Sequence, residues 1–299
     1  MSDDTFRLAV DRNARPFRYY RNAVERHWDP ADIDIARDRN PLIDAHPKTF
    51  ENFRATVAKF GAGERAVTED LAPLAVVLSD AESQAYLSTQ LYEEARHLDF
   101  FERYWREVVN PVEESRGLDP TSPTEDRWIN AAYDELLART DEVMHRLLEA
   151  DTPENRAIAY CHYHLTIEGI LAQTAYWGLQ RSFGPNESDL PTLLGFTEGI
   201  QAIRSDEGRH VGFGMAQLKR LVADGVDPQL LHDTVNELLP LVQRTTTDGI
   251  SADSSRKTPG PSAADLQTYA AEKHTERMAQ ITDESVSLPD VETLVALER

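Results

Sequence analysis

Cysteine is almost absent from this sequence, since Cys161 is the only one among 299 residues. An internal disulfide therefore cannot form, and a cluster of thiolate metal ligands is excluded. Long apolar runs are also missing: the longest, residues 71–78, is interrupted by Pro73 and is far shorter than the roughly 18 residues of a membrane span. The first ten residues contain Asp3 and Asp4 and no long apolar run, which argues against a secretory signal. We therefore expect a cytoplasmic protein without a membrane span.

Lysine is scarce as well, with five residues, and 31 basic side chains face 52 acidic ones to give a formal net charge of −21. Such a surface repels nucleic acid and anionic lipid, so neither is an expected partner. The acidic residues are spread along segments with apolar faces, which is unlike a disordered acidic tail. We interpret the acidity as a halophilic surface that keeps the protein soluble at high salt, and this explanation involves no function.

Glycine is sparse, with 14 residues, and the prolines fall mainly at segment boundaries, so long helices are expected. The sequence predicts an all-α protein of one domain. Residues 1–46 form a leading segment, residues 47–246 a helical bundle, and residues 247–299 a loop and a last helix. Expected helices cover residues 49–78 (with a weak point at Gly61 and Gly63), 80–111, 124–150, 153–184, 191–223, 228–244 and 265–281. Helices of this length are typical of bundles packed side by side.

Two pentapeptides share one pattern of acidic residue, Glu, small residue, Arg and His: residues 93–97 read EEARH and residues 206–210 read DEGRH. On a helix, residues three apart project from the same face, so each Glu and His could hold one metal ion. Carboxylate and imidazole together suit iron and manganese. The spacing alone is weak evidence, because chance predicts roughly one Glu-x-x-His pair in this composition. A third pair, Glu142 and His145, lacks the flanking pattern, and we expect it to be ordinary helix surface or the edge of the core.

A four-helix di-metal site needs two further carboxylates, one from the helix preceding each Glu-x-x-His helix. Glu64 and Glu168 stand in these places, and their distances along the chain suit antiparallel neighbours. Glu168 is surrounded by apolar residues, where a carboxylate is costly to bury unless it is paired or bound to metal. The predicted fold is therefore a ferritin-like four-helix di-metal bundle with additional helices. The predicted metal ligands are Glu64, Glu94, His97, Glu168, Glu207 and His210.

These motifs, together with the WDPADID stretch at residues 28–34, resemble the ribonucleotide reductase small-subunit superfamily. Within it they resemble the ligand-binding oxidases with a mixed manganese/iron site. The resemblance implies a manganese site made by Glu64, Glu94 and His97, and an iron site made by Glu168, Glu207 and His210, with Glu94 bridging; two irons are the alternative pair. It also implies that Asp206 orients a ligand histidine, most simply His97. For Trp28 two roles stay open, electron transfer and packing.

The oxidase branch implies a covalent ether link between a valine and a tyrosine, which here are Val67 and Tyr163. Val67 should share the helix face of Glu64. Tyr163 lies about 140° around an ideal α-helix from Glu168, so spacing alone does not place it at the metals. The reductase subunit usually has a radical tyrosine where this chain has Phe101, and it needs a tyrosine near its carboxyl terminus, whereas the last one here is Tyr269.

The resemblance thus implies a dioxygen-activating di-metal oxidase that forms the link and holds a long-chain fatty acid-like ligand in an apolar channel. Candidate channel residues are Leu171, Ala172 and Phe213, although helical core would read the same way. Two alternatives remain: a reductase small subunit that generates a radical for a large-subunit partner, and a non-catalytic metal-binding bundle. A homodimer is expected because the superfamily pairs through long helices.

Overall fold

A computed structural model describes residues 10–185, 188–247 and 260–296 of the chain, and in these residues all regular structure is helical. The main helices are α1 (Arg15–Glu25), α2 (Arg39–Ile43), α3 (Pro47–Asp70), α4 (Ala72–Val77), α5 (Ala81–Tyr104), α6 (Asn110–Ser115), α7 (Ala131–Arg146), α8 (Pro153–Tyr160), α9 (Gln173–Phe183), α10 (Leu194–Ala223), α11 (Pro228–Thr247), α12 (Ala263–Thr282) and α13 (Val291–Val295). Two π-helices interrupt them, η3 (Trp105–Val109) and η5 (Cys161–Ala172). Three short 3₁₀ turns are η1 (Pro30–Asp32), η2 (Ile35–Asp38) and η4 (Asp126–Trp128).

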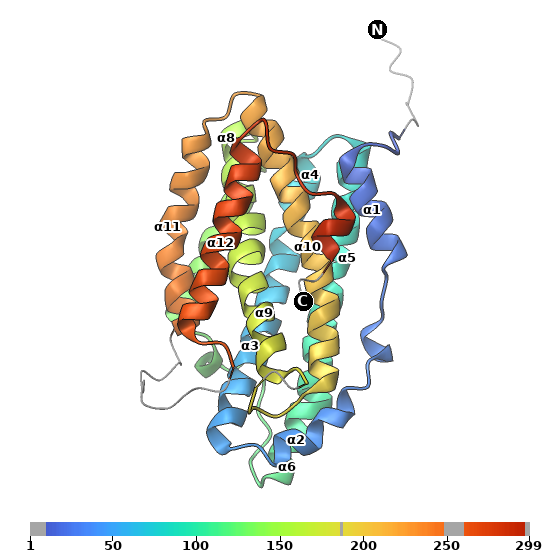
Figure 1. Cartoon of the computed structure of the whole chain (residues 1–299), viewed down its shortest axis with the longest axis vertical. Helices are drawn as coiled ribbons and strands as arrows, with labels where there is room; N and C mark the ends of the chain where they lie inside the picture. The colour runs from blue at the N-terminus through green and yellow to red at the C-terminus, as the bar shows by residue number, and fades with distance from the viewer. Residues whose placement is uncertain (1–9, 186–187, 248–259, 297–299) are drawn as a thin grey trace.

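Four long helical units form the bundle core: α3, α5, the continuous α8–η5–α9 unit and α10. Helices α7 and α11 pack on η5. Helix α12 packs across α9 and α10, and α1 lies along α5 (Figure 1). The buried apolar side chains form two clusters, which together make up most of the core. This arrangement confirms the predicted all-α, ferritin-like architecture. No helix of the described residues is both long and apolar enough to cross a bilayer.

Several predicted boundaries hold because a local cap fixes them. Asp80 accepts the Ser83 amide at 2.8 Å at the start of α5, and Thr152 accepts the Asn155 amide at the start of α8. Helix α12 begins two residues before the predicted start, because the Ser262 and Asp265 side chains form a reciprocal capping box there. The loop predicted before that helix falls largely on residues 248–259, which lie outside the described residues.

Other boundaries were predicted wrongly. The helix expected from residue 124 begins at Ala131, because the preceding residues form η4, where the Trp128 indole donates to the Ser122 carbonyl at 2.7 Å. The first bundle helix breaks at Leu71, between α3 and α4, whereas the helix continues through the expected weak point at Gly61 and Gly63. The leading segment contains a regular helix, α1, with Pro16 in its first turn.

Candidate metal centre

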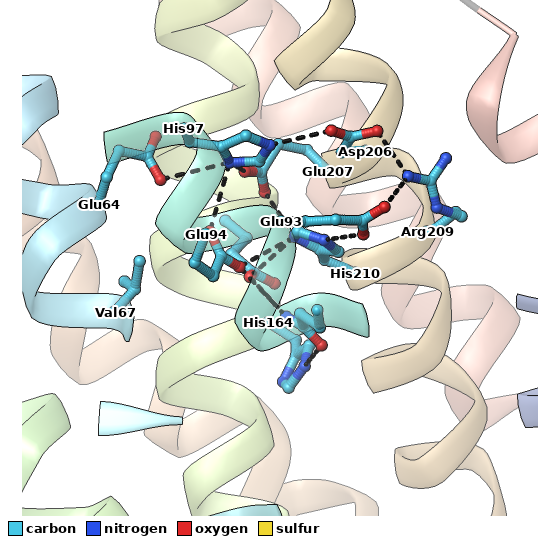
Figure 2. Close-up of polar contacts among 12 residues, drawn as sticks. Glu64, Val67, Glu93, Glu94, His97, His164, Asp206, Glu207, Arg209 and His210 are labelled. Carbon is cyan, nitrogen blue, oxygen red and sulfur yellow. Dashed lines mark hydrogen bonds and ion pairs between the residues drawn. The ribbon is translucent and has the colours of Figure 1, made fainter. Parts of the chain in front are cut away.

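Six side chains from the four core units meet in one buried pocket, and they are the six that the sequence singled out. Figure 2 shows Glu64, Glu94, His97, Glu207 and His210 gathered there. Ligand-type atoms of Glu64, Glu94, His97 and Glu207 all lie within 4.8 Å of one another, and so do those of Glu94, Glu168 and His210. Each of the six is at most 5% exposed. Glu94 takes part in both groups, which is the place that the resemblance implied for a bridging carboxylate.

Both histidines point their Nδ1 atoms into the cluster. His97 Nδ1 lies 3.4 Å from an oxygen of Glu64 and 3.4 Å from one of Glu94. His210 Nδ1 lies 3.1 Å from Glu94 and 3.4 Å from Glu168. Glu207 is 3.6 Å from both Nδ1 atoms, one through each of its oxygens, so it faces both halves of the site and not the second half alone. Ligands about 2.1 Å from a shared ion lie at comparable mutual distances.

The hydrogen-bonding pattern fits a pair of cations. Among the described residues, His97 Nδ1, His210 Nδ1, Glu168 Oε2 and Glu207 Oε2 are buried without a hydrogen-bond partner. Buried polar atoms without partners are rare and costly in folded proteins. All four atoms are lone-pair donors on side chains of the cluster, so metal ions bound there could satisfy them. The donor set of four carboxylates and two imidazoles suits manganese and iron.

The pKa values of the clustered side chains also fit a pair of bound cations. Burial, together with the charges of Glu94 and Glu207, raises the pKa of Glu64 to about 7. Burial also raises the pKa of Glu168 well above its usual range, and that of Glu207 less. Burial opposes protonation of His97, but Asp206, Glu64 and Glu94 still raise the pKa of this histidine well above 6.5. Without cations the cluster therefore holds protons, which metal ions would displace.

In each pentapeptide the first acidic residue accepts a hydrogen bond from the histidine of the other pentapeptide. Asp206, the first residue of the second copy, accepts from His97 Nε2 at 3.0 Å. Glu93, the first residue of the first copy, accepts from His210 Nε2 at 3.0 Å. Each bond places the proton on Nε2 and leaves the Nδ1 lone pair for a metal. The resemblance implied the Asp206 contact; Glu93 was missed, although its place in the repeat is a sequence signal for the same role.

The two arginines of the pentapeptides hold these carboxylates in place. Arg96 donates to Asp206 at 2.7 Å, and Arg209 donates to Asp206 at 2.5 Å and also to Glu93. The burial of Glu93 and Asp206 as anions is possible because each has an arginine partner. Trp28 completes the network by donating its indole N–H to Asp206 at 2.9 Å.

Tyr163 lies at the centre, contrary to what ideal α-helical spacing suggested. It belongs to η5, where backbone hydrogen bonds join residues five apart, so Tyr163 and Glu168 come to share a face. The Tyr163 hydroxyl is 3.3 Å from Glu94 Oε1 and 3.3 Å from the carbonyl oxygen of Val67. Burial and the charge of Glu94 raise the pKa of Tyr163 well above 10, so its hydroxyl stays protonated.

Three further residues support the ligands and were not foreseen: Gln90 and Tyr176 contact ligands directly, and His164 contacts Gln90. Gln90 donates to Glu168 Oε1 at 2.9 Å, and Tyr176 donates to Glu64 Oε1. His164 Nε2 lies 3.4 Å from the side-chain oxygen of Gln90. Burial and the nearby His210 lower the pKa of His164 to about 3, so its ring is neutral. None of the three stands in a recognisable motif, because their roles depend on which helices face one another.

The ring of His164 fits only because α10 has glycine opposite it. A Cβ atom on Gly214 would lie 2.3 Å from the Cβ of His164. We expect Gly214→Ala to lower the free energy of unfolding by about 1–3 kcal/mol, measured by urea denaturation. Gly61→Ala is the matched control, since its Cβ would meet Phe101 at an ordinary 3.5 Å. In that helix interior alanine should stabilise by up to about 1 kcal/mol. Equal effects of the two substitutions would contradict the steric explanation.

The remaining candidates lie away from the centre. Glu142 and His145 are exposed on α7 and pair with Arg146 and Asp141, as expected of ordinary surface. Phe213 packs in the core with its ring 4.6 Å from that of Tyr86. In the described part of the chain a groove of about 720 Å³ runs between α3, α5 and residues 123–134, and neither Phe213 nor Leu171 or Ala172 lines it. The channel role of these three therefore stays a prediction.

Four helical units that direct two Glu-x-x-His pairs and two further glutamates to one buried point define the class of ferritin-like di-metal proteins. No protein-family model matches the chain. Among solved structures it is similar to several variants of the R2-like ligand-binding oxidase. One, with an aerobically reconstituted Mn/Fe cofactor, has a TM-score of 0.80 and 25% identity, and the match covers 94% of this chain and 99% of that one. Another, with an anaerobically reconstituted Mn/Fe cofactor, has a TM-score of 0.79, 26% identity and the same coverage.

The resemblance to the R2-like ligand-binding oxidases, predicted from the motifs, is thereby confirmed in fold over nearly the whole chain. A third such structure, also with a Mn/Fe cofactor, matches with a TM-score of 0.77 and 26% identity over 91% of this chain and 95% of that one.

Proposed function

We propose that this protein is a di-metal oxidase that holds manganese and iron, activates dioxygen and forms an ether link between Val67 and Tyr163. The structural neighbours are oxidases that carry Mn/Fe cofactors, which supports an oxidoreductase. The observation that carries the proposal is the position of the Tyr163 hydroxyl, 3.3 Å from Glu94 and 3.3 Å from the Val67 carbonyl. An oxidisable tyrosine thus lies between a metal-ligand candidate and the valine that it would join.

The chain's own residues prepare this reaction. Glu64, Glu94, His97, Glu168, Glu207 and His210 would hold the metals, and Asp206 and Glu93 fix the two histidines. The pocket excludes water, because Val67 and Tyr163 are 5% and 0% exposed. A bound and reduced Mn/Fe pair would supply the binding site for dioxygen and two of the four electrons that reduce it to water. The link supplies the other two electrons: one C–H bond of Val67 and the O–H bond of Tyr163 break, one C–O bond forms, and two protons and two electrons leave to dioxygen. The two remaining protons needed to form water come from the solvent.

A long-chain fatty acid-like molecule is the ligand that we propose, because the family resemblance implies it. The neighbours' description as ligand-binding oxidases supports a bound ligand without giving its class. Lipid extraction of the purified protein followed by mass spectrometry identifies any such molecule. The homodimer is likewise a proposal, and sedimentation measures it directly.

Two positions bear on the choice between the oxidase and the reductase subunit. Phe101, at the place of the radical tyrosine, stacks on Phe60 with ring centroids 5.4 Å apart, but it does not separate the two alone, because some reductase subunits also have phenylalanine there. Tyr269 is fixed within α12, where it stacks on Trp177 at 4.7 Å and accepts from Arg204 at 3.0 Å. A tyrosine held in this way is unsuited to a mobile tail that carries a radical to a large subunit.

Peptide mapping by mass spectrometry tests the proposal. After loading with Mn(II) and Fe(II) and exposure to air, peptides containing Val67 and Tyr163 should appear as one joined species that lacks two hydrogens. The Tyr163→Phe variant removes the reacting oxygen and should give no joined species, whereas Tyr160→Phe, in the same helical unit, should give the normal yield. If the wild-type peptides remain separate after aerobic loading with both metals, the proposed reaction is wrong.

A further inference from the structure

Arg96 and Arg209, the arginines of the two pentapeptides, have different surroundings on the side that faces away from the metal-ligand candidates. Arg209 is completely buried and contacts Asn22, and α13 covers α10 beside it so closely that a Cβ on Gly208 would lie 2.1 Å from the Leu294 carbonyl. Arg96 instead extends outward beneath an exposed tyrosine, Tyr92. One half of the metal centre is therefore covered by the C-terminal segment, and the other half is connected to the surface.

The connection at Arg96 is a continuous series of contacts. Tyr92 is 54% exposed and stacks on His27 with centroids 5.8 Å apart. The Arg96 guanidinium lies between two rings, 5.4 Å from the centre of Tyr92 and 4.8 Å from that of Trp28, and it donates to His27 Nδ1 at 3.1 Å.

Trp28 continues the series to a metal-ligand candidate. It stacks on His97 with centroids 6.3 Å apart and planes 17° apart, and both side chains donate to Asp206. An unbroken run of rings and hydrogen bonds therefore joins the exposed Tyr92 to His97.

The surface around Tyr92 is less acidic than the chain as a whole. Residues 11–29 contain five arginines against Asp11, Glu25 and Asp29, in a chain whose formal net charge is −21. Arg18 and Arg21 are exposed one helical turn apart on α1, followed by Val24, which is 44% exposed. Arg21 pairs with Glu25 at 2.9 Å and Arg26 with Glu292 at 2.6 Å, whereas Arg18 interacts with Asp290 at longer range. We call Arg18, Arg21, Val24, His27 and Tyr92 the α1–Tyr92 surface.

We propose that the α1–Tyr92 surface is the docking site of an acidic one-electron carrier protein that reduces the metal centre. This inference rests on the proposed function. In each encounter the reduced carrier loses one electron and the oxidised metal pair gains one, so two encounters return the pair to its divalent state. The rest of the acidic surface repels such a carrier, and basic side chains act within a Debye length of roughly 8–10 Å. The arginines of α1 would therefore orient the carrier toward Tyr92.

Binding measurements on the metal-free chain test the surface independently of oxidase chemistry. The probe is a plant-type [2Fe–2S] ferredoxin of negative net charge. We expect Arg18→Glu with Arg21→Glu to raise the Kd about tenfold at 0.05 M salt, and the difference to vanish at 0.5 M. The matched control is Arg139→Glu with Arg146→Glu, which makes the same charge change on α7, a helix packed on α3, α8 and α11. The control pair should change the Kd by less than twofold.

Anaerobic reduction of the metal-loaded protein gives the second readout. Reduced ferredoxin should reduce the α1 charge-reversal variant about tenfold more slowly than the α7 control, whereas dithionite, a small reductant, should reduce both at one rate. The inference is overturned if the α1 variant binds ferredoxin as tightly as the wild type. It is also overturned if sedimentation shows a wild-type dimer that the α1 substitutions alone dissociate, because a second copy then covers this surface. A chain that binds ferredoxin here but never links Val67 to Tyr163 would refute the proposed function and leave the docking surface intact.

Discussion

Loading with Mn(II) and Fe(II) should raise the midpoint of thermal unfolding by about 10 °C at pH 7.5 and by much less at pH 5. Ions that bind only the folded chain stabilise it by about 4 kcal/mol when their free concentration is 1,000 times the Kd. At pH 5 the metals must compete with protons, because the pKa of Glu64 is about 7 and those of Glu168, His97 and His210 are well above their usual values. Differential scanning calorimetry at both pH values measures the two shifts.

The metal-free chain should show the opposite pH dependence. A carboxyl group whose pKa is higher in the folded chain stabilises it fully below the unfolded value, near 4.5 for Glu64, and this stability is lost as pH rises to about 7. Glu64 alone accounts for roughly 3 kcal/mol of this loss. The raised pKa values of His97 and His210 extend it above pH 6.5. The pKa values of Asp206 and Glu94 are lowered, so the stability that these groups contribute is lost only in more acidic solution.

Two substitutions separate the metal centre from other titrating groups. Burial and the neighbouring Asp141 raise the pKa of Asp70, at the end of α3, to about 7, the same value as for Glu64. Both Asp70→Asn and Glu64→Gln should weaken the pH dependence of the metal-free chain. Only Glu64→Gln should also reduce the stabilisation by metal. If Asp70→Asn abolishes that stabilisation too, the ions bind elsewhere.

The sequence identified the six ligand candidates because their signals are local. A Glu and a His three residues apart share a helix face whatever the rest of the chain does, and the repeat of the whole pentapeptide distinguished these pairs from Glu142 and His145. The capped starts of α5 and α8 were predictable for the same reason. The start of α7 was not, because η4 is held by the contact of Trp128 with the turn before it.

The position of Tyr163 depends on the π-helix η5, which no local pattern in the sequence predicts. Gly169 is the closest to a local signal, because a Cβ there would lie 2.9 Å from the carbonyl oxygen of His164, five residues earlier in the widened turn. Ideal α-helical geometry therefore assigned Tyr163 to the wrong face, and only the resemblance connected it with Val67. Gln90 and Tyr176 were not predicted, because they donate hydrogen bonds to ligand candidates on other helices. Such contacts depend on how the helices pack and leave no local pattern in the sequence.

The crosswise support of the histidines predicts that each half of the centre can be weakened separately. Glu93→Gln removes the carboxylate from His210 Nε2, and Asp206→Asn removes it from His97 Nε2. Each change should lower the metal affinity of its own half about 10- to 100-fold, because the carboxylate fixes the ring and the tautomer. Calorimetric titration with Mn(II) followed by Fe(II) measures the two affinities. The lowered affinity should belong to the His210 half in Glu93→Gln and to the His97 half in Asp206→Asn.

Arg209→Gln provides the control for these variants. It removes the ion pairs to both Glu93 and Asp206 but leaves both contacts between carboxylate and histidine in place. We expect it to destabilise the chain by about 3–5 kcal/mol, since two buried anions each lose a partner. It should not weaken one half selectively. If Glu93→Gln and Asp206→Asn lower both affinities equally, as Arg209→Gln would through the shared network, the carboxylates act by maintaining the fold and not by orienting individual ligands.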